Sequence, residues 1–138
     1  MSELSILAIA IGGAFGSVSR FLVAREMGRL LGNFLPYGTL VVNVLGSLAL
    51  GWLATVFLAR PEINIALRLG IAVGFLGAFT TFSAFSFESV QLMLNGAVWR
   101  AVLNVTVNTV VCLGMCYLGM QLAPVSYTHL TLPTICSV

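Results

Sequence analysis

The chain contains neither lysine nor aspartate, and charged residues make up only 7% of its 138 residues. The six basic residues are all arginine and the four acidic residues are all glutamate, which leaves a net charge of +2. Proteins that bind nucleic acids carry a dense basic patch that neutralises several phosphates, and these arginines are few and dispersed. The low charge therefore argues against a nucleic-acid partner.

Histidine and cysteine are also scarce. The single histidine, His129, lies near the C-terminus, and the three cysteines are Cys112, Cys116 and Cys136. Cys112 and Cys116 fall in an apolar stretch, where cysteine usually behaves as a small apolar residue, and two cysteines alone make a poor metal site. Because the sequence displays neither a metal-ligand cluster nor a nucleophile–base pair, we expect no enzymatic activity.

Hydrophobic residues, in contrast, make up 59% of the chain, and the mean hydropathy of +1.08 is far above that of a soluble domain. Four apolar runs are each about long enough to cross roughly 30 Å of hydrocarbon as a helix. They span 4–24, 38–59, 69–87 and 101–123. The sequence therefore predicts an all-α integral membrane protein with four transmembrane helices in contact with the lipid bilayer.

Short connections are expected between these helices, at 25–37, 60–68 and 95–100. Residues that commonly end helices fall in the first two of them: Gly28, Gly32, Pro36 and Pro61. Residues 1–123 then form one four-helix subunit. Residues 124–138 mix proline, serine and threonine in a segment too short and too polar to span a membrane, and we expect a disordered or non-native tail.

The arginines near the helix ends show only a weak preference for one side of the membrane. Two groups are expected on opposite sides: Arg20, Arg25, Arg29 and Arg100 on one, and Arg60 and Arg68 on the other. The side with more basic residues normally faces the cytoplasm, so this small difference sets no firm orientation. We therefore expect insertion in both orientations and pairing of opposite copies as an antiparallel homodimer.

The first apolar run contains IGGAFGSVSR, in which Gly12 and Gly16 form a GxxxG pair. Small residues at this spacing allow two helices to pack closely. Arg20 ends the motif, and a guanidinium near hydrocarbon is costly unless it faces water, a carboxylate or an anion. Its side chain can also extend along the helix to the interface, so structural and functional roles both stay open for Arg20.

The second run begins GTLVVNVLGSLALG and places the amide of Asn43 among apolar residues. An unsatisfied amide there costs on the order of 1–3 kcal/mol, so Asn43 needs a partner. The partner is either another helix, which makes Asn43 a packing residue, or a polar path that the amide lines.

The third run contains GFLGAFTTFSAF, residues 74–85, where small and hydroxyl residues interrupt the apolar sequence. Gly74, Gly77, Thr80 and Thr81 are weak helix formers, which favours a break near the middle of the helix. Irregular backbone at membrane depth is tolerated only when it is buried in protein or lines a cavity, and its carbonyl groups can ligate a cation. The alternative is a continuous helix whose small residues only pack.

Two phenylalanines follow at a spacing that places them on one helical face. Phe82 and Phe85 present positive ring edges, which can attract a small anion without binding it tightly. The alternative is that they face lipid or the protein core. Glu88, one turn further on, is the one carboxylate expected well inside a span; it is either functional, or protonated, or close enough to the boundary for water to reach it.

The fourth run carries a polar stripe at successive i, i+4 steps: Asn104, Asn108, Cys112 and Cys116. Such a stripe either lines a path or joins helices through hydrogen bonds.

Taken in order, GGAFGSVSR, GTLVVNVLGSLALG and GFLGAFTTFSAF resemble the three signature blocks of the Fluc fluoride channels, also called CrcB-type fluoride exporters. The resemblance covers residues 1–123. It implies an antiparallel, dual-topology homodimer in the bacterial plasma (inner) membrane. Two fluoride pores per dimer would let fluoride leave the cell passively, which gives fluoride resistance.

The resemblance also implies roles for particular residues. Phe82 and Phe85 match the paired pore phenylalanines, Asn43 the amide that contacts the anion, and Arg20 the vestibule arginine. The remaining pore-side positions are Ser83, Glu88, Asn108 and Cys112. The backbone carbonyls of Gly77 and Thr80 match those that hold a central structural sodium ion in the family.

This chain departs from the family pattern at several positions. Ala84 replaces a threonine, Asn104 stands where tyrosine is common, and Asn108 and Cys112 stand where serines are common. These departures change the expected lining of the pore and leave the overall resemblance intact.

Two alternatives belong to other classes of protein. A proton-coupled small multidrug transporter would also be a four-helix dimer, but it would need a glutamate in the middle of the first helix, where this chain has only Glu3 at its very start. A non-transporting membrane assembly subunit would conduct no ion.

Overall fold

The computed structural model describes residues 2–124, so the tail expected at 124–138 lies almost wholly outside the described residues. Four helical segments are long and apolar enough to cross a membrane, which confirms the all-α, multi-pass prediction. They are α1 (Glu3–Leu31), α2 (Tyr37–Ala59), the segment Ile65–Leu94, and α6 (Val98–Leu122). The third segment consists of α3 (Ile65–Leu69), the π-helix η1 (Gly70–Leu76), α4 (Gly77–Phe79) and α5 (Phe82–Leu94).

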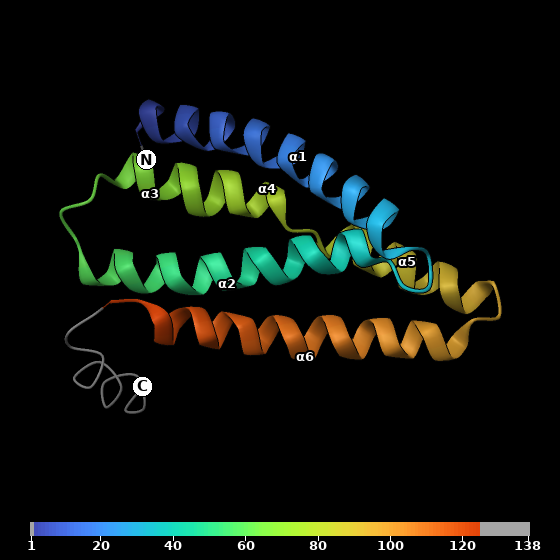
Figure 1. Ribbon diagram of the computed structural model, residues 1–138. Helices are drawn as coiled ribbons and strands as arrows, with labels where there is room; N and C mark the ends of the chain where they lie inside the picture. Colours follow the sequence, from blue (N-terminus) through green and yellow to red (C-terminus); the bar gives the residue numbers. More distant parts are fainter. Residues whose placement is uncertain (1, 125–138) are drawn as a thin grey trace.

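The four segments lie side by side, with the start of α1 and the end of α6 at the same end of the bundle (Figure 1). α1 packs mainly against η1, and also against α2, α3 and α4. α2 packs mainly against α6, and α5 packs against α6 as well. The third segment therefore changes neighbours along its length, from α1 in its first half to α6 in its second.

The connection expected at 25–37 is shorter than predicted. α1 continues through Gly28 to Leu31 and ends at Gly32, which has a φ of 87° that suits glycine. Gly28 was wrongly expected to stop the helix, because glycine within a helix only weakens it by about 1 kcal/mol relative to alanine. The second connection also ends early, since Asn64 caps α3 by accepting a hydrogen bond from the Ala66 N–H at 2.7 Å.

Arginines hold the connections at both ends of the bundle. Arg100 donates hydrogen bonds to the backbone carbonyls of Asn33 and Phe34, which ties the start of α6 to the connection between α1 and α2. At the other end, Arg68 donates to the carbonyls of Arg60 and Ile63. Arg100 and the Arg60–Arg68 pair therefore lie at opposite ends, as the sequence predicted.

The GxxxG pair of α1 is a packing face, as expected. An added Cβ at Gly12 would lie 2.0 Å from the Gly70 carbonyl oxygen, and one at Gly16 would lie 2.2 Å from the Phe75 carbonyl oxygen. Real Cβ atoms essentially never approach backbone this closely. Glycine at these two positions therefore lets α1 and η1 pack with their backbones in contact.

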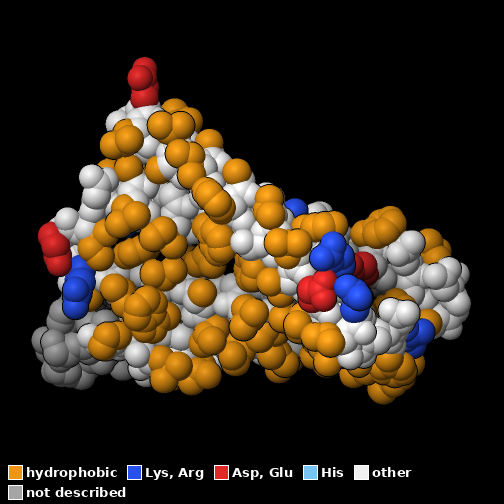
Figure 2. Space-filling view, turned by 45° about the horizontal axis from the view of Figure 1, so that its top comes forward, with side chains coloured by type: hydrophobic (Ala, Val, Ile, Leu, Met, Phe, Trp, Pro, Cys, Tyr) orange, Lys and Arg blue, Asp and Glu red, His pale blue; other side chains and the backbone are white. Residues whose placement is uncertain are grey.

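The exterior of the bundle is apolar. Figure 2 shows hydrophobic side chains over most of one face, with charged side chains in a few separate places. Many large hydrophobic residues are more than half exposed, among them Phe15, Leu58, Leu94, Val110 and Leu113. A surface of this kind is stable against lipid tails and would aggregate in water, which is consistent with the membrane assignment.

Candidate functional site

The helical backbone of the third segment is interrupted between α4 and α5. Thr80 and Thr81 have extended dihedral angles, with φ and ψ of −86° and 160° at Thr80 and −153° and 120° at Thr81. The Thr81 N–H does not donate to the carbonyl of Gly77 four residues earlier, as it would in a continuous helix, but to the side chain of Asn43. The interruption therefore leaves backbone groups that other parts of the protein must satisfy.

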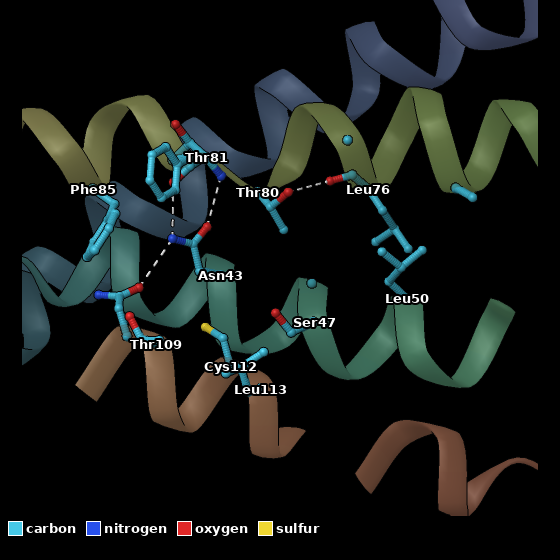
Figure 3. Close-up of a pocket in the computed structure, with 15 residues that line it drawn as sticks. Asn43, Ser47, Leu50, Leu76, Thr80, Thr81, Phe85, Thr109, Cys112 and Leu113 are labelled. Atoms are coloured by element: carbon cyan, nitrogen blue, oxygen red, sulfur yellow. Dashed lines mark hydrogen bonds between the residues drawn. The ribbon is translucent and has the colours of Figure 1, made fainter. Parts of the chain in front are cut away.

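Asn43 of α2 satisfies both backbone groups of Thr81. Its Oδ1 accepts the Thr81 N–H at 2.8 Å, and its Nδ2 donates to the Thr81 carbonyl at 3.1 Å. Figure 3 shows Asn43 directly opposite Thr81, with both bonds drawn. This pairing supplies the interhelical partner that the half-buried amide requires.

Hydrogen bonds continue from Asn43 through α6 to α5. Asn43 Nδ2 also donates to Asn108 Oδ1 at 3.3 Å, and Asn108 Nδ2 donates to Asn104 Oδ1 at 3.2 Å. Asn104 Nδ2 then donates to Ser89 Oγ at 2.9 Å. Asn104, Asn108 and Ser89 are all buried, so this network joins three helices away from the exterior.

A cavity of about 420 Å³ lies beside the interruption and is called the first cavity here. The phenylalanine pair forms part of its wall, with ring centroids 5.4 Å apart and planes tilted by 53°. Phe82 is 77% exposed, so its ring lies at the open side of the cavity. Figure 3 shows Phe85 beside Asn43, and Cys112 with its sulfur toward Ser47. The first cavity thus combines ring edges, amides and a thiol in an otherwise apolar wall.

A second cavity of about 640 Å³ lies on the other side of Thr81, which lines both. Arg20 and Arg25 contribute guanidinium groups to it, and Ser83 and Glu88 contribute polar groups. Arg20 Nη1 approaches the Thr80 carbonyl at 3.5 Å. Arg25 is ion-paired with Glu26 at 3.1 Å, so it is the Arg20 guanidinium that favours anions in this hollow.

Glu88 faces the second cavity together with Thr39 of α2. The Thr39 hydroxyl donates to Glu88 Oε1 at 2.9 Å. The other carboxyl oxygen, Oε2, is buried and has no hydrogen-bond partner within residues 2–124. Because an unpartnered buried oxygen is costly, the Glu88 carboxyl group is the least satisfied polar side chain in the described part of the chain.

The structure brings most of the predicted site residues to the first cavity: Asn43, Gly77, Thr80, Phe82, Phe85, Asn108 and Cys112. It places the other three, Arg20, Ser83 and Glu88, at the second cavity. Sequence reasoning did not single out Thr39, Ser47, Thr81 or Ser89 as site residues. Their hydroxyl groups are common in membrane helices, so only the observed pairings distinguish them.

Metal ligands of the usual kind are not grouped in residues 2–124, where no three His, Cys, Asp or Glu side chains lie together. Backbone carbonyl oxygens can also ligate a cation. The carbonyl of Gly77 has lost its usual donor, because the Thr81 N–H bonds to Asn43 and the Thr80 N–H bonds to the carbonyl of Leu76. A hard cation such as sodium prefers oxygen ligands of this kind, so the Gly77 carbonyl fits such an ion, whereas the Thr80 carbonyl is shared with Arg20 Nη1 at 3.5 Å.

Comparison with known proteins gives a consistent result. The family model described as CrcB-like protein, Camphor Resistance (CrcB), matches residues 7–120. A curated relative from Vibrio campbellii, named "Fluoride-specific ion channel FluC", is 46% identical over 123 residues, which is 88% of this chain and 97% of the relative. Relatives of the same name from Shewanella halifaxensis and Syntrophotalea carbinolica are 45% and 44% identical, over 86% and 87% of this chain and 94% and 98% of their own lengths.

Proposed function

Because this chain belongs to the CrcB-like family, we propose that it is a fluoride-selective ion channel through which fluoride leaves the cell passively down its gradient. It is then a transport protein and not an enzyme. The similarity to relatives named as fluoride channels supports this function. The single structural observation that carries it is the first cavity, where two phenylalanine rings and the amides of Asn43 and Asn108 meet at an interrupted helix.

Fluoride is small and strongly hydrated, so a selective path must replace its water with other donors. Asn108 and the hydroxyl of Ser83 supply N–H and O–H donors along the third segment, and Asn43 holds the interrupted backbone and the Asn108 amide beside the ion's path. The rings of Phe82 and Phe85, 5.4 Å apart, offer weakly positive edges that attract the ion without holding it. Weak, successive contacts suit conduction, because the ion must leave each position as easily as it arrives.

The second cavity serves as the vestibule in this proposal. Arg20 raises the local concentration of anions there, and Ser83 and Thr81 lead from it toward the first cavity. The Ser83 hydroxyl lies 3.1 Å from that of Thr81, so the two hydroxyls form a short polar step between the cavities. Glu88 and Cys112 are further pore-side groups, and Cys112 offers only a weak donor where a hydroxyl would be strong.

The working unit in this proposal is an antiparallel homodimer with two pores, inserted in both orientations in a bacterial plasma membrane. The weak arginine bias between the two ends supports insertion in both orientations. The exposure of Phe82 at the open side of the first cavity supports a second copy that completes the wall. An isologous dimer of this kind contains two copies of each site.

A sodium ion is proposed as a structural cofactor at the centre of that dimer, held by the carbonyls of Gly77 and Thr80. When bound, it would be ligated by the Gly77 carbonyl, which the interrupted helix leaves without its helical donor, and by the Thr80 carbonyl, which Arg20 Nη1 approaches at 3.5 Å. This chain's own part is to keep the Gly77 oxygen free, which it does by turning the Thr81 N–H toward Asn43.

Replacing sodium with N-methylglucamine at equal ionic strength should therefore lower the melting temperature of the purified protein and shift dimer toward monomer. At sodium concentrations 100-fold above the dissociation constant, the stabilisation amounts to about 2.7 kcal/mol. The measurement is thermal unfolding with size-exclusion chromatography in both salts. Identical melting and elution in the two salts would remove the sodium site from the proposal and leave the fluoride pathway untouched.

The function itself is tested by fluoride efflux from liposomes that contain the purified protein, followed with a fluoride electrode. We expect rapid release of fluoride and little release of chloride. Release of a drug cation without fluoride would favour a small multidrug transporter, and release of neither would favour a non-transporting subunit. Within the described residues, the carboxylates of α1 are Glu3 and Glu26, both near its ends and neither at its middle, where such a transporter needs one.

A further inference from the structure

In the hydrogen-bonded network that runs from Asn43 to α5, the groups at the two ends determine which amide atom donates and which accepts at each step. At the α5 end, the Ser89 hydroxyl donates to the Phe85 carbonyl at 2.7 Å, and a carbonyl can only accept. The single hydroxyl proton of Ser89 is then used, so Ser89 can only accept from Asn104. Asn104 must therefore turn its Nδ2 toward Ser89 and its Oδ1 toward Asn108.

The same reasoning continues along α6. Since Asn104 presents an acceptor, Asn108 must present its Nδ2 to Asn104 and its Oδ1 to Asn43. At the far end, the Thr81 N–H can only donate, which requires Asn43 to present its Oδ1 to Thr81. Both ends thus demand the same orientation of all three amides, and a reversed amide would bring two acceptors or two donors together.

This orientation decides which amide is free to bind a ligand. Asn43 has two N–H groups, and the Thr81 carbonyl and Asn108 Oδ1 use both. Asn108 also has two, but only the bond to Asn104 uses one, and the other has no acceptor within residues 2–124. Asn108 lines the first cavity with Phe82 and Phe85. The unshared amide donor of the first cavity therefore belongs to Asn108.

We propose that Ser89 and Asn104 are positioning residues that act through Asn108, holding its amide so that one N–H stays available to the anion in the first cavity. The inference rests on the proposed function, because it assigns a purpose to the free N–H. Ser89 and Asn104 line neither cavity, so they act only through the network. Asn43 is held by both backbone groups of Thr81 at the other end of the network, so Ser89 and Asn104 act on the Asn108 amide.

Ser89→Ala tests this positioning role, and Ser86→Ala is the matched control variant. Ser86 lies on the same helix and donates to the Phe82 carbonyl at 2.9 Å, the same kind of bond, but it has no part in the network. Ser89→Ala leaves Asn104 Nδ2 without its acceptor, so the Asn108 amide is then held from the Asn43 end alone. We expect fluoride efflux from liposomes to fall about threefold in Ser89→Ala, the size of one interhelical hydrogen bond in a membrane, and to stay unchanged in Ser86→Ala.

Two further comparisons separate positioning from a loss of folding. Ser89→Thr retains the hydroxyl and should restore the wild-type rate. The double variant Ser89→Ala/Asn108→Ala should conduct no more slowly than Asn108→Ala alone, because Ser89 acts through Asn108. If the reductions in fluoride efflux multiply in the double variant, Ser89 acts independently of Asn108, and the proposed positioning role is overturned.

A measurement that does not depend on fluoride flux tests the positioning role of Ser89 separately. In protein labelled with ¹⁵N-asparagine in lipid nanodiscs, Ser89→Ala should shift the side-chain amide resonances of Asn104 and Asn108, whereas Ser86→Ala should leave both in place. A shift confined to Asn104 would overturn the proposal. If wild-type liposomes release no fluoride, the proposed function fails, while these resonances still decide whether Ser89 orients the amides.

Discussion

Gly16→Ala is expected to lower the free energy of unfolding by about 1–3 kcal/mol or more, one of the largest single-residue effects in this chain. The added methyl group would lie 2.2 Å from the Phe75 carbonyl oxygen and 3.0 Å from the Phe75 Cα. These are backbone atoms of η1, so no side chain can rotate away to make room. α1 and η1 would have to separate, and the contacts along α1 would be lost with them.

The measurement is thermal or denaturant unfolding in detergent, with gel filtration to report loss of assembled protein. Gly28→Ala is the matched control, because Gly28 lies on the same helix and an added Cβ there meets no atom within 4 Å. It should unfold at the same temperature as the wild type or higher, since alanine is the better helix former by about 1 kcal/mol. Equal stability of the two variants would show that α1 and η1 tolerate separation.

The sequence predicted the membrane segments well, because hydropathy is a local property that a run of residues carries by itself. It predicted the ends of the segments less well. Gly28 resembles a helix stop, yet α1 continues past it, with Glu26 paired to Arg29 at 3.4 Å on the helix surface. Whether a glycine ends a helix depends on the residues after it, and at the end of α1 the residue that adopts positive φ is Gly32.

The candidate site was predicted as a set of residues and not as a set of contacts. Asn43 was expected to need a partner, but its partner Thr81 lies 38 residues away in sequence, and spacing within one helix says nothing about such a pair. Thr39 and Ser89 were missed for the same reason, since their hydroxyls matter through Glu88 and Asn104 on other helices. Long-range pairing follows from how the segments pack, which single-residue properties do not determine.

Asn43→Leu is expected to reduce fluoride efflux by roughly 30-fold or more. The substitution keeps the volume of the side chain but removes three hydrogen bonds, two to Thr81 and one to Asn108. Interhelical hydrogen bonds in membranes are worth about 0.6–1.7 kcal/mol each, so the three together hold the interrupted backbone by about 2–5 kcal/mol. Every 1.4 kcal/mol is a factor of ten in the population of the conducting arrangement.

Asn108→Leu is the control variant for Asn43→Leu. That variant removes the third bond but leaves both bonds between Asn43 and Thr81, so the backbone between α4 and α5 keeps its conformation. We expect Asn108→Leu to conduct poorly yet to retain its stabilisation by sodium, and Asn43→Leu to lose both conduction and that stabilisation. In Asn43→Leu the Thr81 N–H is free to bond to the carbonyl of Gly77, so the helix can close across the interruption. The Gly77 carbonyl oxygen is then no longer available to sodium. Wild-type flux in Asn43→Leu would show that the conformation of Thr81 is held by packing alone.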